Sequence, residues 1–134
     1  MTSQNNDLLL MSLKFDANGL IPAIAQQHDT NEVLMVAWMS KESLQETLET
    51  GQVCYWSRSR QALWRKGESS GQTQALLSLR VDCDADVLLL IVDQTGVACH
   101  TGRRTCFYNE WKDGRFHELM KPEVSESDLY GKSS

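Results

Sequence analysis

The chain has 134 residues, a formal net charge of −5 at pH 7 and 41% hydrophobic residues. This length predicts a single domain with a modest core, and the acidic balance argues against a nucleic-acid-binding surface. No apolar run is long enough to span a bilayer, and the first residues lack the basic segment and cleavage site of a signal peptide. Cysteines beside aspartates fit a reducing compartment better than a disulfide framework, so we expect a cytoplasmic protein.

The first third of the chain predicts short strands. Residues 1–12 are expected to be a flexible N-terminus. The segments Leu13–Phe15 and Ile21–Gln26 are predicted strands, joined by a turn at Asp16–Gly19. The apolar run Val33–Met39 predicts another strand.

A short amphipathic helix is predicted over Ser40–Thr50, with Ser40 as its N-cap and Gly51 just past its end. Leu44 and Leu48 lie four residues apart and share one face of this helix. Lys41 is expected on the exposed start of the helix, where its charge has no role in binding.

Two basic segments follow a predicted strand at Val53–Trp56. The first, Ser57-Arg58-Ser59-Arg60, alternates hydroxyl groups with guanidinium groups, which can bind a phosphate through paired hydrogen bonds. The second combines Trp64-Arg65-Lys66 with a loop over Gly67–Gly71, where glycines let backbone N–H groups approach an anion. The alternative is a pair of exposed basic turns, but two such loops in one short chain favour phosphate binding.

The stretch Val81–Phe107 holds most of the residues that can carry chemistry. It follows a predicted strand at Gln74–Val81 and begins with Asp82, Asp84 and Asp86, which would share one face if the strand continued. Three carboxylates on one face repel each other unless a cation lies among them, and oxygen ligands suit Mg²⁺. The alternative is a solvated acidic edge, but the apolar run Val87–Val92 follows directly and indicates a place near the core.

The same stretch contains Cys83, Cys99 and Cys106, whose thiolates suit Zn²⁺. Three protein ligands plus water is the pattern of catalytic zinc, which lowers the pKa of its water to about 7. The alternatives are closed structural sites, either Cys₄ with Cys54 or Cys₃His with His100. The spacing is not the C-x-x-C of zinc ribbons, which favours the open site.

The remaining elements are predicted hairpins. A turn at Asp93–Gly96 leads to a return strand at Val97–Cys99, and a final hairpin joins Phe107–Trp111 to Arg115–Leu119. Residues 121–134 are expected to be a polar tail. The pattern therefore predicts an α+β, predominantly β protein, with one domain over residues 13–120. We expect a compact mixed or antiparallel sheet, similar to a barrel, and one short helix.

The segment DCDADVLLLIVDQTGVACHTGRRTCF resembles the signature of the phosphoribosyl-AMP cyclohydrolase family of histidine biosynthesis. That signature runs roughly D-C-D-x-D, then an apolar strand, then A-C-H-T-G-x-x-S-C-F. The chain departs from it at Thr105, where the family usually has serine, and keeps the hydroxyl. The segments YWSRSR and LWRKGESSG are also similar to the family, and the resemblance covers about residues 13–110.

The resemblance implies a homodimer in which zinc ligands come from both chains, Cys83 from one and Cys99 with Cys106 from the other. Cys54 lies outside the family's metal set. We assign Mg²⁺ to the three aspartates named above. A third basic segment, Thr101-Gly102-Arg103-Arg104, lies beside the expected zinc ligands Cys99 and Cys106. The substrate-binding residues expected from all three segments are Trp56, Ser57, Arg58, Ser59, Trp64, Lys66, Gly67, Thr101, Gly102, Arg103 and Arg104.

The activity expected from the resemblance is hydrolysis of the N1–C6 bond of phosphoribosyl-AMP, dependent on zinc and magnesium. His100 adjoins a zinc ligand and is the candidate for proton transfer, or else a hydrogen-bonding group that only orients the site. Two alternatives are another zinc hydrolase acting on a purine nucleotide and a zinc-stabilised binding module without chemistry. A zinc deaminase would carry H-x-E and P-C-x-x-C motifs, and the sequence has neither.

Overall fold

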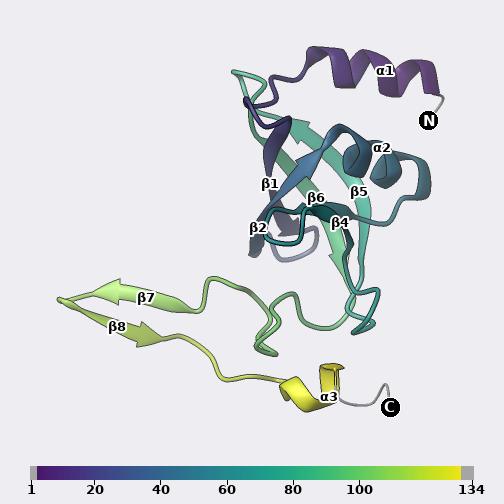
Figure 1. The fold of residues 1–134 in the computed structure, drawn as a ribbon. Helices are drawn as coiled ribbons and strands as arrows, with labels where there is room; N and C mark the ends of the chain where they lie inside the picture. The colour runs from purple at the N-terminus through teal and green to yellow at the C-terminus, as the bar shows by residue number, and fades with distance from the viewer. Residues whose placement is uncertain (1–2, 131–134) are drawn as a thin grey trace.

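The computed structural model describes residues 3–130 of the chain (Figure 1). Its elements are α1 (Ser3–Ser12), β1 (Leu20–Gln27), β2 (Val33–Ser40), α2 (Lys41–Thr50), β3 (Cys54–Ser57), β4 (Ala62–Arg65), β5 (Gln74–Val81), β6 (Leu88–Gln94), β7 (Asn109–Lys112), β8 (Arg115–Glu118) and α3 (Glu126–Tyr130). Within these residues, none of the helices has the length and apolar character needed to cross a membrane.

Six strands form one mixed sheet in the order β4-β3-β2-β1-β6-β5. β1 and β6 are parallel, and the other neighbouring strands are antiparallel. The sheet curls until an isolated bridge joins Gln52, just before β3, to Ala75 in β5. The N–H of Val53 also donates to the carbonyl of Gln74 at 2.9 Å. The predicted α+β, predominantly β class with a curled mixed sheet is confirmed.

Alternation along the strands directs every second side chain into the curled sheet. Ile21 and Ala23 in β1, with Leu88 and Leu90 in β6, have no exposed surface. Burial of each large aliphatic side chain contributes about 1.5–3 kcal/mol, so these strands form the centre of the core. Leu44 from α2 is also fully buried and belongs to the same core.

The predicted helix is confirmed as α2. The hydroxyl of Ser40 accepts the N–H of Ser43 at 3.1 Å, and the Ser43 hydroxyl accepts the N–H of Ser40 at 2.9 Å. This reciprocal pair satisfies N–H groups that have no partner inside the helix. Gly51 ends α2 at a φ of 77°, a left-handed conformation that glycine adopts without strain.

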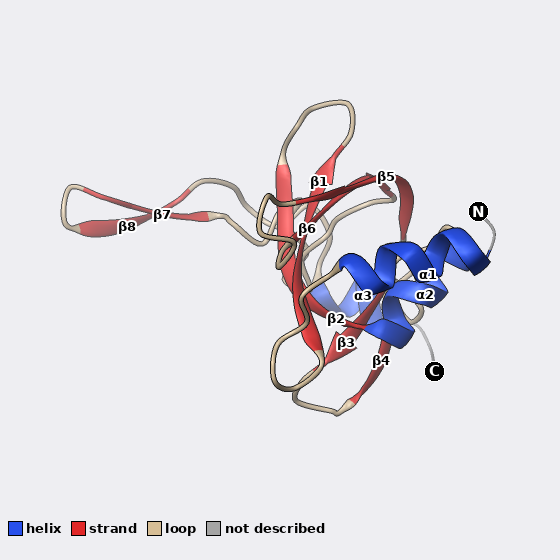
Figure 2. Cartoon of the chain, turned by 90° about the horizontal axis from the view of Figure 1, so that it is seen from above, coloured by secondary structure: helices blue, strands red, loops and turns tan. Residues whose placement is uncertain are grey.

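The predicted final hairpin is confirmed as β7 and β8, which form a separate two-stranded sheet. Figures 1 and 2 show this hairpin extending away from the curled sheet. Trp111 and Phe116 pair across it in a T-shaped contact, with 5.0 Å between ring centroids, although both are more than 60% exposed. The two rings therefore contact mainly each other and solvent.

The start of the chain differs from the prediction. Residues 3–12 form α1, and residues 1–2 of the expected flexible segment lie outside the described part of the chain. The predicted strand at Leu13–Phe15 is wrong. Asp16 instead accepts the N–H groups of Asn18 and Leu20 at 2.8 and 3.0 Å, so the turn leads into β1 without a preceding strand.

The predicted return strand at Val97–Cys99 is also wrong. β6 already pairs with β1 on one side and with β5 on the other, so neither of its edges can accept a further strand. The strand that forms a hairpin with β6 is β5, which precedes it in the chain. The turn between β5 and β6 contains the three aspartates. The aspartates therefore lie in a turn, and the predicted continuation of the strand that would place them on one face is wrong.

Two further segments differ from expectation. Trp64 and Arg65 belong to β4, which pairs with β3, and only the residues after them form the expected loop. The polar tail contains α3, in which Leu129 is buried. Residues 131–134 of that tail lie outside the described part of the chain.

Candidate functional site

The predicted metal ligands lie at opposite ends of the curled sheet. The β5–β6 turn, residues 82–87 and here called the acidic turn, is near α1, whereas the segment after β6 lies at the other end (Figure 1). β6 has seven residues. A strand rises about 3.3 Å per residue, so β6 separates the two ends by about 20 Å. Because Zn–S bonds are about 2.3 Å long, Cys83 and Cys99 of one chain cannot bind the same zinc ion.

The acidic turn gathers carboxylates and a thiol. Ligand atoms of Asp82, Cys83 and Asp84 lie within 4.8 Å of one another, and all three residues are exposed. One carboxylate oxygen of Asp82 accepts the N–H groups of Asp84 and Asp86, both at 3.2 Å. The turn therefore replaces the predicted strand as the element that brings these side chains together.

The carboxylates of the acidic turn influence one another's pKa. The N–H and then the side chain of Asp86 lower the pKa of Asp82, while the hydrogen-bonded Asp82 carboxylate raises the pKa of Asp86. Two carboxylates this close are more stable when one holds a proton. A divalent cation could replace that proton, and the oxygen donors fit Mg²⁺.

The second cluster lies in the thiol loop, residues 97–107. The N–H of Cys99 donates to the carbonyl of Arg103 at 3.1 Å, which folds the loop back on itself. The N–H of Cys106 donates to the carbonyl of Leu34 at 2.7 Å and attaches the loop to β2. The Cys99 and Cys106 thiols are close enough to influence each other electrostatically. The structure thus brings together two of the three predicted zinc ligands.

Thr105 helps to hold the thiol loop in place. Its buried hydroxyl donates to the carbonyl of Val33 at 2.7 Å and accepts the N–H of Phe107 at 3.0 Å. A serine hydroxyl could make the same two bonds. The departure from the family signature at this position therefore leaves the loop geometry intact.

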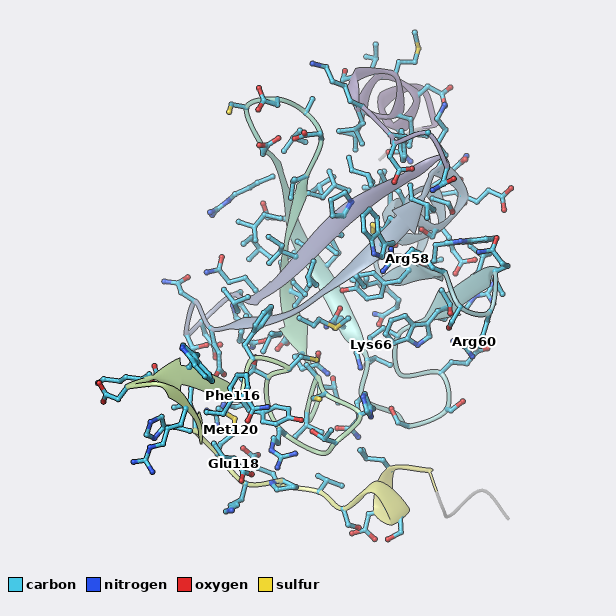
Figure 3. All side chains as sticks on the ribbon, turned by 60° about the vertical axis from the view of Figure 1, so that its left-hand side comes forward. Arg58, Arg60, Lys66, Phe116, Glu118 and Met120 are labelled. Carbon is cyan, nitrogen blue, oxygen red and sulfur yellow. The ribbon has the colours of Figure 1, made fainter. Side chains whose placement is uncertain are left out.

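Lys66 connects the end of β4 to the thiol loop, as Figure 3 shows. Its ammonium group donates to the carbonyl of Ala98 at 2.9 Å, and the side chain is buried. Burial lowers the pKa of Lys66, whereas the nearby Cys106 and Cys99 thiols act in the opposite direction. Partial burial and then Cys99 raise the pKa of Cys106 to about 12. Adjacent sulfur donors beside a cation form a donor set that fits Zn²⁺ rather than Mg²⁺.

A network of glutamine side chains that starts from buried Tyr55 and Gln74 supports the thiol loop, and it was not predicted from the sequence. The hydroxyl of Tyr55 donates to Gln74 at 2.6 Å, and Gln74 donates to Gln94 at 2.9 Å. Gln94 then donates to the carbonyl of Thr95 at 2.8 Å, and the side chain of Gln72 accepts the N–H of Val97 at 2.8 Å. The available signal was Gln74 at the start of the predicted strand Gln74–Val81, where alternation can place a polar side chain on the buried face.

The first predicted phosphate-binding segment forms the turn between β3 and β4. Ser57 accepts the backbone N–H of Arg60 at 3.3 Å, which shapes the turn. The guanidinium group of Arg58 lies over the Trp38 ring, 4.6 Å from its centroid. Within residues 3–130, neither Arg58 nor Arg60 forms an ion pair. Arg60 Nε also donates to the Ser57 hydroxyl at 3.4 Å, and no carboxylate in this part of the chain competes with an anion for either arginine.

The second segment, which runs from Trp64 to Gly71, lines a cavity of about 300 Å³. The residues that line it include Arg60, Trp64, Lys66 and Gly67. Gly67 has a φ of 81°, and a Cβ atom there would lie 2.5 Å from the backbone of Gln72. The close approach of two backbone segments therefore requires glycine at this position. Whether this cavity holds substrate stays a prediction.

Side chains of the third segment, residues 101–104, already form hydrogen bonds or ion pairs within the chain. The hydroxyl of Thr101 donates to the Cys99 sulfur at 3.1 Å, and a Cβ atom on Gly102 would lie 1.7 Å from the carbonyl oxygen of Val124. Arg103 pairs with Glu118, while Arg104 pairs with Glu32 and Glu123. Phosphate binding by these side chains stays a prediction, and a phosphate would compete with these carboxylates.

Arg103→Ala is expected to loosen the β7–β8 hairpin. The guanidinium group of Arg103 contacts Glu118, donates to the carbonyl of Met120 at 3.1 Å and stacks 4.0 Å from the Tyr108 ring centroid. These contacts attach the hairpin base to the thiol loop, so their loss should accelerate hydrogen exchange of hairpin amides. Arg115→Ala, in exposed β8, is the control. Unchanged exchange in Arg103→Ala would contradict an anchoring role.

His100 follows Cys99 in the thiol loop and is exposed. Its ring is therefore accessible to solvent and to a ligand next to the two thiols. The proton-transfer role assigned from the sequence stays a prediction.

Comparison with known proteins identifies the family. The family model described as phosphoribosyl-AMP cyclohydrolase matches residues 35–108, which include both the acidic turn and the thiol loop. A phosphoribosyl-AMP cyclohydrolase of Rhodospirillum centenum is 61% identical over 132 residues, covering 98% of this chain and 99% of the relative. Proteins of the same name from Magnetococcus marinus and Rhodospirillum rubrum are each 62% identical, covering 92% of this chain and 95% and 87% of the relatives, respectively. The chain therefore belongs to the phosphoribosyl-AMP cyclohydrolase family.

Proposed function

We propose that this protein hydrolyses the N1–C6 bond of phosphoribosyl-AMP and so opens the adenine ring in histidine biosynthesis. The observation that carries the proposal is the pair Cys99–Cys106, held in the thiol loop next to buried Lys66 and within the family-matched residues. The ribosyl group on N1 makes the ring cationic and C6 electrophilic, so attack by a water-derived nucleophile at C6 leads to cleavage of the N1–C6 bond.

The proposed active form is a homodimer with Cys83 of one protomer near Cys99 and Cys106 of its partner. The separation of about 20 Å along β6 excludes a three-thiol site within one chain. Exposed apolar side chains, including Val36 on β2 and Trp111 with Phe116 on the hairpin, offer surface for a second copy. Two equivalent sites per dimer would follow from a two-fold axis.

The proposed cofactors are Zn²⁺ at the three cysteines and Mg²⁺ at Asp82, Asp84 and Asp86. Zinc in such a site would lower the pKa of a water molecule towards neutrality, and magnesium would anchor or polarise the substrate. His100 would move the proton, because it follows a thiol ligand and its ring is accessible. Arg58, whose guanidinium group lies over the Trp38 ring, would hold a phosphate and thereby position C6 for attack.

The test is incubation of the purified protein with phosphoribosyl-AMP while the ultraviolet absorbance change on ring opening is followed. We expect turnover that stops after chelation and returns after zinc and magnesium are added. Adenosine monophosphate, which lacks the N1 ribosyl group, is the control substrate and should give no change. A protein that binds stoichiometric zinc but leaves phosphoribosyl-AMP intact would instead be a zinc-stabilised binding module.

A further inference from the structure

A cavity of about 710 Å³ opens between the start of β1, the β2–α2 junction and the β3–β4 turn. Leu20 at the start of β1 pairs with Ser40 at the end of β2, and both residues line the cavity. Ala23 of β1 pairs in register with Leu88, the first residue of β6, so the acidic turn before β6 is level with the start of β1. The cavity and the acidic turn therefore lie at the same end of the sheet.

Two cations line this cavity. Lys41 from the start of α2 and Arg58 from the β3–β4 turn both contribute to its wall, and the carboxylate among the lining residues belongs to Glu42. The ammonium group of Lys41 lies 5.5 Å from the Phe15 ring centroid, and Arg58 lies over the Trp38 ring. Neither forms an ion pair with a carboxylate in residues 3–130. Aromatic faces position the two cations and leave their N–H donors available.

The rest of the lining suits a sugar phosphate. Trp56 is half-buried and offers a flat apolar surface, and it pairs across the strands with Trp38. Gln61 also lines the cavity, and its side-chain amide donates to the carbonyl of Arg58 at 2.7 Å, which fixes the backbone that carries the guanidinium group. The two cations could bind the phosphate of such a ligand, and the Trp56 ring could pack against its sugar or base.

We infer that this cavity binds a terminal phosphate of a sugar-phosphate ligand, and that Lys41 is a binding residue together with Arg58. The inference deepens the proposed function and rests on it, because the proposed substrate carries a phosphate at each end. The phosphate would then lie at the same end of the sheet as the proposed Mg²⁺ site. Lys41 was not predicted as a binding residue, because the β3–β4 turn that lines the same cavity is distant from it in the sequence.

The inference is tested by calorimetric titration of the metal-loaded protein with adenosine monophosphate and with ribose 5-phosphate. These two probes represent the two ends of the proposed substrate. Lys41→Met and Arg58→Met should each weaken binding of at least one probe by about tenfold or more, the range expected for a charged hydrogen bond. Lys41→Arg should keep most of the affinity. Lys112→Met, at the exposed end of β7, removes the same charge at a distance from the cavity and should bind as the unaltered protein does.

The outcomes separate this inference from the proposed function. Adenosine, which lacks the phosphate, should bind at least about tenfold more weakly than adenosine monophosphate if a charged phosphate contact contributes to affinity. Unchanged affinity of Lys41→Met for both probes would overturn the cavity assignment, even if the unaltered protein turns over phosphoribosyl-AMP. Absence of turnover by the unaltered metal-loaded protein would instead overturn the proposed function. Circular dichroism of each variant checks that the fold is retained.

Discussion

Mixing the Cys83→Ser and Cys99→Ser variants, each inactive alone, is expected to restore about one quarter of wild-type activity. Each substitution replaces a soft sulfur donor with a hard oxygen and should remove tight zinc binding. In a mixed dimer, one site receives both substitutions, and the other receives neither. Random exchange makes about half of the dimers mixed, and half of the sites in those are intact. Co-expression of differently tagged chains, followed by zinc analysis and activity measurement, checks this result.

Two matched controls define the outcome. Mixing Cys99→Ser with Cys106→Ser should restore nothing, because both ligands come from the same thiol loop and every site keeps one substitution. Cys54→Ser should retain zinc, because this buried residue of β3 belongs to neither cluster. Its hydrogen-bonded backbone, in which the N–H donates to the Thr47 hydroxyl at 2.9 Å, indicates a structural position. If the mixture of Cys83→Ser with Cys99→Ser regains no activity either, the zinc ligands are not shared between chains as proposed.

Local sequence patterns predicted the elements whose structure depends on neighbouring residues. The apolar runs at Ile21–Gln26 and Val33–Met39 became β1 and β2, and the helix ending at Gly51 has the predicted caps. Each of these depends on alternation, on a capping side chain or on a glycine conformation, which are properties of a few adjacent residues. The thiols and carboxylates could be proposed as metal ligands for the same reason, since donor chemistry belongs to the residue type.

Errors arose where the fold depends on distant residues. The return strand at Val97–Cys99 failed because β1, far earlier in the chain, occupies the edge of β6 that it required. Parallel pairing of this kind leaves no signal near either strand. The sequence also offered no means of placing Lys41 beside Arg58, because the two meet only after α2 and β3 have folded together. Helix α1 lacks an acidic first turn and a basic last turn, so end-charge patterns did not indicate it.

The basic residues show how much of a binding site depends on tertiary context. Arg58 and Arg103 have equal standing in the sequence, each next to hydroxyl or glycine residues. In the structure Arg58 lies over an aromatic ring and has no carboxylate partner among residues 3–130, whereas Arg103 is paired with Glu118. Charge and residue type alone cannot distinguish these states, because the partner of Arg103 comes from a hairpin that forms separately.

Asp84→Asn is expected to weaken Mg²⁺ binding while stoichiometric zinc is retained. Its carboxylate lies within 4.8 Å of the ligand atoms of Asp82 and Cys83, so it can share a cation with them. Asp82, in contrast, also accepts two backbone N–H groups and shapes the turn, which makes Asp84 the cleaner site for substitution. Changing even an outer-shell group costs about 10–100-fold in metal affinity, so loss of a direct carboxylate ligand should cost at least about tenfold.

Titration of activity against Mg²⁺ and metal analysis of the same samples together check the Asp84 prediction. Asp113→Asn in the β7–β8 turn removes an equal charge from an exposed position, where the φ of 56° is one that asparagine tolerates. It should leave both metals unaffected. The close approach of Asp84 to Cys83 makes the test demanding, since a rearranged turn would disturb the thiol as well. Equal loss of zinc and magnesium in Asp84→Asn would assign the aspartates to the zinc site, and the division into two metal sites would then be wrong.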